Sequence, residues 1–154
     1  MAAGTFTLYS KNKEDLRIND LTGAVVNIAL VASTYTPNTD SSTGHSLWSD
    51  VSVNEIANGF GYITGGQALS ADVATAIAGG FKYTSSNVAW TATGGSIPAW
   101  RYAVMYVVGS LWGMTNPIVG YMLGDSTPAD IPATTDTNIL TLAVPSGGWF
   151  DSTS

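Results

Sequence analysis

The sequence contains no cysteine and unusually little charge. Without cysteine, the chain can form no disulfide, no thiolate metal site and no cysteine nucleophile. Charged residues make up 10% of its 154 residues, whereas an average soluble protein has about 25%. Only five residues are basic, and they are scattered along a chain of net charge −6. Because no basic stripe is present to neutralise phosphates, we expect no nucleic-acid partner.

Long hydrophobic runs are also missing. No stretch of about 18 uncharged apolar residues occurs, so we expect neither a membrane span nor a membrane partner. The N-terminal stretch MAAGTFTLYSKNKED lacks the charged segment and the apolar core of a signal peptide. We therefore expect a protein that is made in the cytoplasm without export.

The apolar residues that are present form short runs separated by turns. The clearest runs occupy residues 24–33, 101–110, 117–124 and 138–145. In the first run, Val26, Ile28 and Leu30 would share one face of a strand, with Val25 and Ala29 on the other face. This period of two predicts strands.

The run at 101–110 is apolar on both faces after Arg101, which is typical of a strand at the centre of a sheet that is covered on both sides. Turn-forming Gly, Pro, Asn and Asp residues are dense between the runs. We predict a single mainly β domain over residues 1–154, an antiparallel β-sandwich or barrel-like fold with one short N-terminal helix and long polar loops.

Two segments have helical character. Ser10 can cap a short helix that ends at Asn19, with Glu14 and Asp15 in its first turn. The segment 70–80 is rich in alanine and ends in two glycines, as a helix often does, although its Val and Thr residues leave a strand possible.

Both ends of the chain have features of contact segments. Residues 1–12 are predicted to form an arm that reaches a neighbouring molecule. Residues 146–154 are predicted to form a tail, in which Trp149 and Phe150 follow two glycines and can dock onto another chain or fold back.

The stretch HSLWSDVSVNEI, residues 45–56, holds the only histidine and is the first candidate for chemistry. A zinc site takes three or four ligands, but His45 has no second histidine and no cysteine to join it. On a strand, Asp50 and Glu55 would point to opposite faces. We therefore interpret the stretch as a structural junction, in which Trp48 is buried, Asp50 hydrogen-bonds a turn and His45 is largely exposed.

Other patterns also fall short of a catalytic or cofactor site. No serine lies in a G-x-S-x-G elbow, and Gly59, Gly61 and Gly65 miss the dinucleotide-binding spacing by one residue. The acidic loop 125–138 lacks the spacing of a calcium loop. We expect no enzyme, no metal and no cofactor.

Five aromatic residues leave two interpretations open. They could form a carbohydrate-binding platform, or they could belong to the core or to a subunit interface. The residues are Trp48, Trp90, Trp100, Tyr102 and Tyr106.

Six short pieces of the sequence, in this order, resemble a group of small structural proteins from the virions of tailed bacteriophages. The patterns of the group are S-x-Y-T-P-N, W-S-D-V-x-x-N-E, G-Y-x-x-G-G-x-x-L, V-x-W-T and A-R-Y-A-V-x-Y, followed by a strand that begins with proline. Together they cover about two thirds of the chain. The pieces are NIALVASTYTPN (27–38), WSDVSVNEI (48–56), GYITGGQAL (61–69), VAWTA (88–92), WRYAVMYV (100–107) and NPIVGYMLG (116–124).

The resemblance implies a β-rich, non-enzymatic coat component. We expect a capsid decoration (cement) protein on the virion surface, which binds the major capsid protein and copies of itself, as a trimer. The expected contact residues lie in loops or in the tail: Trp112, Met114, Trp149 and Phe150. The alternatives are a tail, baseplate or fibre-associated subunit and a carbohydrate-binding attachment module.

Overall fold

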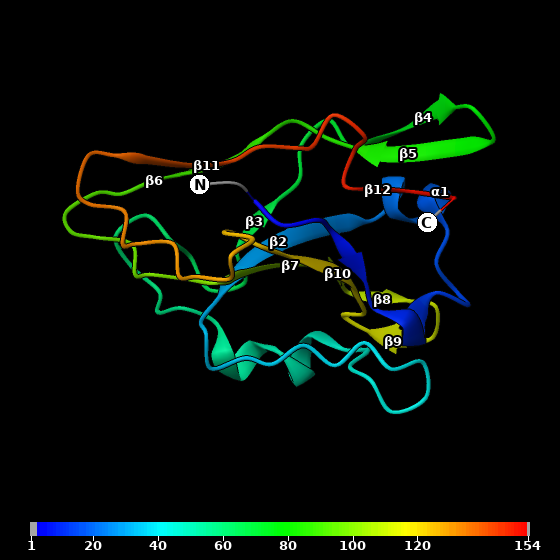
Figure 1. Cartoon of the computed structure of the whole chain (residues 1–154), viewed down its shortest axis with the longest axis horizontal. Helices are drawn as coiled ribbons and strands as arrows, with labels where there is room; N and C mark the ends of the chain where they lie inside the picture. The colour runs from blue at the N-terminus through cyan, green and yellow to red at the C-terminus, as the bar shows by residue number, and fades with distance from the viewer. Residues whose placement is uncertain (1–2, 154) are drawn as a thin grey trace.

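A computed structural model describes residues 3–153 as a layered, mainly antiparallel β domain (Figure 1). Its helical elements are short: α1 (Ile18–Thr22) and the 3-10 turns η1 (Ser10–Asn12), η2 (Trp48–Asp50) and η3 (Ser52–Asn54). The strands are β1 (Thr7–Leu8), β2 (Val25–Val31), β3 (Gln67–Ala68), β4 (Val73–Ile77), β5 (Gly80–Thr84), β6 (Val88–Thr91), β7 (Tyr102–Val108), β8 (Ser110–Leu111), β9 (Met114–Thr115), β10 (Ile118–Leu123), β11 (Ile139–Leu142) and β12 (Phe150–Asp151). The predicted fold class is therefore confirmed.

A five-stranded sheet with the order β1-β10-β7-β2-β3 forms the middle layer. Its central strand β7 is buried on both faces, because alternate side chains enter two different cores. Met105 and Val107 belong to the larger core, whereas Val104 and Tyr106 belong to the smaller one. The prediction of a doubly covered strand at 101–110 is confirmed.

Two small sheets cover one face of the middle layer. Strands β6 and β11 form one of them, and β12, β5 and β4 form the other, so both lie along the upper side of Figure 1. Their inward residues complete the larger core, which includes Trp90 and Leu142. The predicted run 138–145 contains β11, in which Leu142 is buried and Ile139 is exposed.

The opposite face is covered by a layer with little regular structure. The segment 32–56 runs below the middle sheet in Figure 1 and contains η2 and η3. Its inward side chains, Tyr35, Trp48 and Val51, form the smaller core with the underside of β7. The layer on this side of the middle sheet is thus a loop held in place by its aromatic residues.

The predicted helix from Ser10 to Asn19 is wrong in its bounds. Only the turn η1 and the five-residue helix α1 form in this region, and Arg17 between them is extended. The side-chain amide of Asn12 explains the break, because it donates 2.8 Å hydrogen bonds to the backbone oxygens of Ser46 and Ile118. These two bonds hold the chain against the middle sheet.

Within the segment 70–80 the residues Val73–Ile77 form strand β4, so the strand that the Val and Thr residues left possible is present and the helix is not. Strands β4 and β5 form a hairpin, in which Ile77 pairs with Gly80. Gly79 in the turn has φ +81°, a conformation that glycine adopts without strain. Ala78 and Gly79 therefore form the hairpin turn, and Gly80 begins β5.

Neither predicted contact segment extends away from the domain. Within residues 3–12, β1 pairs with β10 at the edge of the middle sheet; Met1 and Ala2 lie outside the described residues. Within residues 146–153, β12 pairs with β5, and Trp149 and Phe150 are only 2% and 7% exposed. Ser154 lies outside the described residues. The tail folds back because burying two large aromatic rings removes much apolar area from water.

Candidate interaction surface

The stretch 45–56 is organised around a stacked aromatic pair. The rings of Trp48 and Tyr106 lie 4.3 Å apart and only 5° from parallel. Asp50 accepts 3.0 Å hydrogen bonds from the backbone N–H groups of Ser46 and Leu47. Burial raises the pKa of Asp50, but these two N–H donors together with the nearby His45 and Lys11 hold the pKa below its usual value. The predicted burial of Trp48 and turn-bonding role of Asp50 are confirmed.

His45 is half-buried, so its predicted exposure is wrong. Its Nδ1 atom lies 2.8 Å from the hydroxyl of Tyr35, which in turn lies 2.8 Å from the hydroxyl of Tyr9. Burial raises the pKa of Tyr9 strongly and raises that of Tyr35 to about 12. Both tyrosines are therefore neutral near pH 7, and His45 ends a buried chain of hydroxyl groups that pins the loop 36–47.

Within the described residues, the surroundings of this histidine include the Tyr35 hydroxyl and no cluster of metal-ligating side chains. Within residues 3–153 no three His, Asp or Glu side chains lie close enough to hold a metal ion. Four of the five aromatic residues that could have formed a carbohydrate platform are in the cores instead, and Tyr102 is half-buried against the smaller core. Those that are buried are Trp48, Trp90, Trp100 and Tyr106.

Glu55 organises the loop that follows, residues 57–66. Its Oε1 atom accepts hydrogen bonds from the Tyr62 hydroxyl at 2.7 Å and from the Gly65 backbone N–H at 2.6 Å. The same hydroxyl accepts a 2.9 Å bond from the backbone N–H of Leu30 in β2. The loop is therefore tied to the middle sheet through buried groups. Sequence reasoning missed this role because Glu55 and its partners belong to separate turns.

The fixed loop and the neighbouring turn η3 carry three exposed apolar side chains. Val53 is 86% exposed, Phe60 52% and Ile63 69%; we call these three residues the 53–63 surface. Phe60 has φ +54°, and its ring lies so close to Gly95 that a Cβ atom there would come within 2.4 Å. Phe60 is thus held in one place although half of it faces water.

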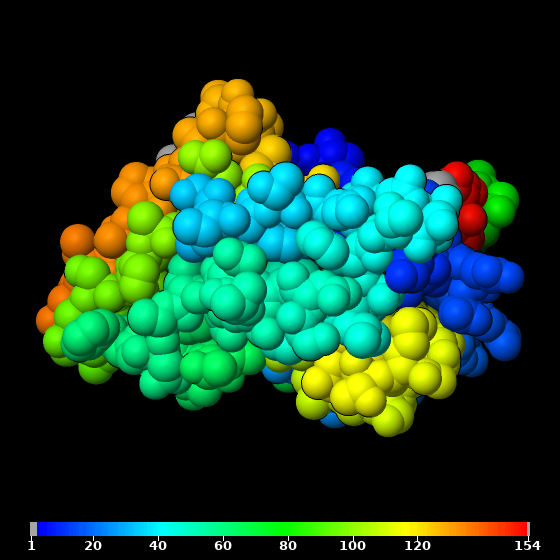
Figure 2. Space-filling model, turned by 90° about the horizontal axis from the view of Figure 1, so that it is seen from below, coloured from blue at the N-terminus to red at the C-terminus, as the bar shows by residue number. Residues whose placement is uncertain are grey.

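Figure 2 shows the face to which this layer belongs. The segment 35–65, in cyan to green, crosses the width of the molecule, and the β8–β9 hairpin, in yellow, lies beside it. That hairpin carries Trp112 and Met114, both half-buried. The indole N–H of Trp112 donates a 2.9 Å hydrogen bond to Asp20 in α1. Two of the four expected contact residues are therefore partly accessible.

The other two expected contact residues are almost fully buried. Trp149 donates a 3.0 Å hydrogen bond to the Ser85 hydroxyl and packs in the larger core. Phe150 stacks on Phe6 at 5.9 Å and an interplanar angle of 17°. Both side chains stabilise the fold, and the expectation that they bind a neighbour is corrected.

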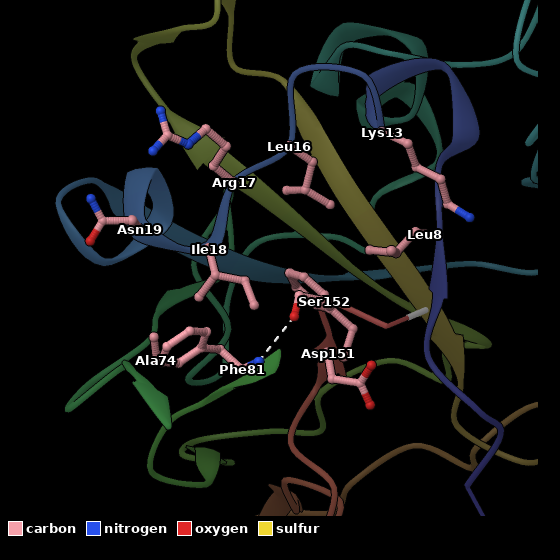
Figure 3. A pocket seen from close by; sticks show the side chains of 11 residues that line it. Leu8, Lys13, Leu16, Arg17, Ile18, Asn19, Ala74, Phe81, Asp151 and Ser152 are labelled. Carbon is pink, nitrogen blue, oxygen red and sulfur yellow. Dashed lines mark hydrogen bonds between the residues drawn. The ribbon is translucent and has the colours of Figure 1, made fainter. Parts of the chain in front are cut away.

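An apolar groove lies between residues 8–19 of the N-terminal segment and the strands β4, β5 and β12 (Figure 3). Its volume is about 480 Å³. The apolar lining comes from the N-terminal segment, β4, β5 and β12, and Lys13 and Arg17 stand at the rim. The Ser152 hydroxyl closes one side by accepting a 2.9 Å hydrogen bond from the Phe81 N–H. The apolar residues are Leu8, Leu16, Ile18, Ala74, Phe81 and Phe150.

Comparison with known proteins adds no functional assignment. No protein-family model matches the chain, and neither a curated protein nor a solved structure matches it. Within the described residues 3–153, no helix is both long enough and apolar enough to cross a membrane.

Proposed function

We propose that this chain is a non-enzymatic structural protein of a tailed-phage virion, a capsid decoration protein that binds the outer surface of the major capsid protein shell. The observation that carries the proposal is the 53–63 surface. It holds three large apolar side chains in water, Val53 on the turn η3 and Phe60 and Ile63 on the loop 57–66, which buried and part-buried hydrogen bonds fix to the middle sheet. The sequence resemblance to phage virion proteins supports the same class.

A fixed apolar loop suits binding to a repeating surface. Because Phe60 and the loop around it are already ordered, binding loses little conformational entropy. The chain has few charged groups that would need to be desolvated in a contact. A shell offers many identical sites, so contacts of modest individual strength can give high occupancy where copies also contact one another.

Labelling of intact particles tests the proposed location. Virions of the phage that encodes the chain are purified and treated with a gold-labelled antibody against the protein. Even label over the head is expected. Label confined to the tail would support a tail, baseplate or fibre-associated subunit instead, and particles without label would refute a virion role.

Variants of the 53–63 surface test the proposed contact. Phe60→Ser combined with Ile63→Ser is expected to reduce the amount of protein on the heads at least tenfold while the protein stays folded. The matched control is Val25→Ser combined with Ile139→Ser, which removes two exposed apolar side chains elsewhere. Equal occupancy for the two double variants would overturn the assignment of the contact.

The carbohydrate-binding alternative has less support from the geometry. Sugar platforms need accessible aromatic faces, whereas the four core aromatic residues are buried. Trp112 is the accessible tryptophan candidate among the described residues, and its N–H is already bonded to Asp20. A glycan array probed with the folded protein distinguishes the two functions, since a decoration protein is expected to give no binding.

A further inference from the structure

Strand β4 is an open edge of the three-stranded sheet. The sheet has the order β12-β5-β4, and β4 forms its outer margin at the upper right of Figure 1. Helix α1 lies near this sheet on the side of the groove, where Ala74 and Ile18 both contribute to the lining. The hydrogen-bonding side of β4 that faces away from β5 is therefore not covered by α1.

The hydrogen bonds of β5 determine which groups this edge presents. The Tyr83 and Phe81 carbonyls accept 2.8 Å bonds from Trp149 and Ser152, so these carbonyls point toward β12. In an antiparallel ladder successive residues of a strand bond to opposite neighbours, so the β5 residues that alternate with Phe81 and Tyr83 bond to β4. Ala76 and Ala74 stand opposite Phe81 and Tyr83 and take no part in those bonds, so their backbone groups face outward. Within residues 3–153 no backbone or side-chain group bonds to these four outward atoms.

The edge has none of the features that normally prevent edge-to-edge pairing. Natural edge strands carry a charge, a proline or a bulge that blocks a second strand. Strand β4 reads VATAI, without charge or proline, and its five pairs with β5 run in unbroken register. Val73 and Thr75 are exposed on its outer face. Such an edge is a template for another strand.

We propose that two copies of this chain pair through β4, antiparallel and centred on Thr75. The sequence of the strand is nearly symmetric about Thr75, so the pairing places Ala74 opposite Ala76 and Val73 opposite Ile77 of the second copy. In this register the N–H and C=O groups of Ala74 and Ala76 in each copy all form hydrogen bonds with the other copy. A register that places Ala74 opposite Ala74 of the second copy would use only the two groups of Ala74. The contact is isologous, as a two-fold dimer requires.

The charges near the edge allow this contact. Each copy has net charge −6, but no charged side chain lies within β4, and Asp72 would face Ala78 of the second copy. Thr75 would face Thr75, a cross-strand pair that stabilises sheets. The product is one continuous six-stranded sheet across the two-fold axis. This goes beyond the proposed function, because it concerns copies in solution without any shell.

The molar mass of the purified full-length chain tests the pairing. Analytical ultracentrifugation is expected to give a dimer. Thr75→Glu is expected to give a folded monomer. The introduced carboxylate stands opposite Lys82 within the chain, which favours the fold. In the dimer it would face the same carboxylate of the second copy across the two-fold axis, which disfavours pairing. The control is Thr141→Glu on β11, which makes the same charge change on another exposed strand residue and is expected to leave the dimer intact.

A trimeric or monomeric mass for the native chain would overturn the proposal, as would a Thr75→Glu variant that stays dimeric. These outcomes leave the proposed function separately testable, because particle labelling does not depend on the dimer. A trimeric mass would instead support the trimer that the sequence resemblance implied.

Cross-linking provides a positive test of the register. In the proposed pairing Thr75 occupies a position without direct hydrogen bonds to its counterpart, where Cα atoms lie about 4.5 Å apart, within the range of about 4.4–6.8 Å that disulfides span. The chain has no cysteine of its own. Thr75→Cys is expected to give a disulfide-linked dimer under mild oxidation, and Thr141→Cys a monomer on the same non-reducing gel. Equal yields from the two variants, or none from Thr75→Cys, would refute the register.

Discussion

Removal of the Trp48 side chain should reveal how much stability depends on the loop layer below the middle sheet. Trp48 is 9% exposed and stacks on Tyr106 at 4.3 Å. Replacement of a buried tryptophan by alanine costs about 3–5 kcal/mol, and the value includes the loss of an aromatic pair that contributes about 0.5–1.5 kcal/mol beyond its buried area. We therefore expect Trp48→Ala to lower the free energy of unfolding by about 4 kcal/mol.

Such a loss is large against the about 5–15 kcal/mol that stabilises a typical domain. Since each kcal/mol lowers the melting temperature by about 2–4 °C in a chain of this length, the midpoint should fall by about 8–16 °C. Guanidinium unfolding monitored by circular dichroism measures the change, with an unchanged slope expected for a protein that still unfolds in one step.

Two further variants make this test specific. Trp48→Phe keeps a ring against Tyr106 and should lose less than half as much stability as Trp48→Ala. Val53→Ala, at an exposed position of the same layer, should change stability by less than about 0.5 kcal/mol. A loss below about 1 kcal/mol for Trp48→Ala would refute the conclusion that its stacking holds this layer in place.

Three other predictions concern buried groups and close backbone contacts. Burial raises the pKa of Tyr35 from 10.0 to about 12. The stability that depends on its neutral form is therefore complete below pH 10 and is lost as the pH rises to about 12. Tyrosinate absorbance and unfolding, followed together as the pH is raised, should show this loss of stability. Gly66→Ala should cost more than about 3 kcal/mol, because the new Cβ would lie 2.0 Å from a backbone oxygen at φ +79°, whereas Gly147→Ala, in open space, should be nearly neutral in thermal melts. Glu55→Ala leaves two donors unpaired and should cost about 2 kcal/mol and speed amide exchange across the loop 57–66.

The strand pattern could be predicted where burial follows a strict period. In β2 the alternation of Val26, Ile28 and Leu30 with Ala29 matches the two cores of the structure. In β7 the unbroken apolar run corresponds to a strand covered on both sides. These predictions succeeded because a period of two fixes which side chains face which layer, whatever the partners are.

The predictions failed where a tertiary partner outweighed local preference. Alanine favours helices, yet the segment 70–80 forms β4 because β5 supplies a complete antiparallel partner next to a glycine turn. The two aromatic residues at the C-terminal end were expected to contact another molecule. Pairing of β12 with β5 buries both of them within the same chain.

The candidate site was predicted only in part. The stretch 45–56 was correctly interpreted as a junction around Trp48, and Trp112 and Met114 are partly accessible as expected. The 53–63 surface was missed. Its residues look like ordinary strand or turn residues in the sequence, and their exposure depends on the hydrogen bonds of Glu55 to a loop that follows it.

The sequence by itself determined that this is a mainly β chain without thiol chemistry, and which faces of its longest strands are buried. These properties depend on composition and on short-range periodicity, which each segment carries alone. Only the tertiary structure decided that the loop 57–66 is fixed, that both chain ends fold back and that β4 has no partner on its outer side within the described residues. Each of these depends on which distant segments meet, and the balance of hydrogen bonds and buried area between them appears only when the chain has folded.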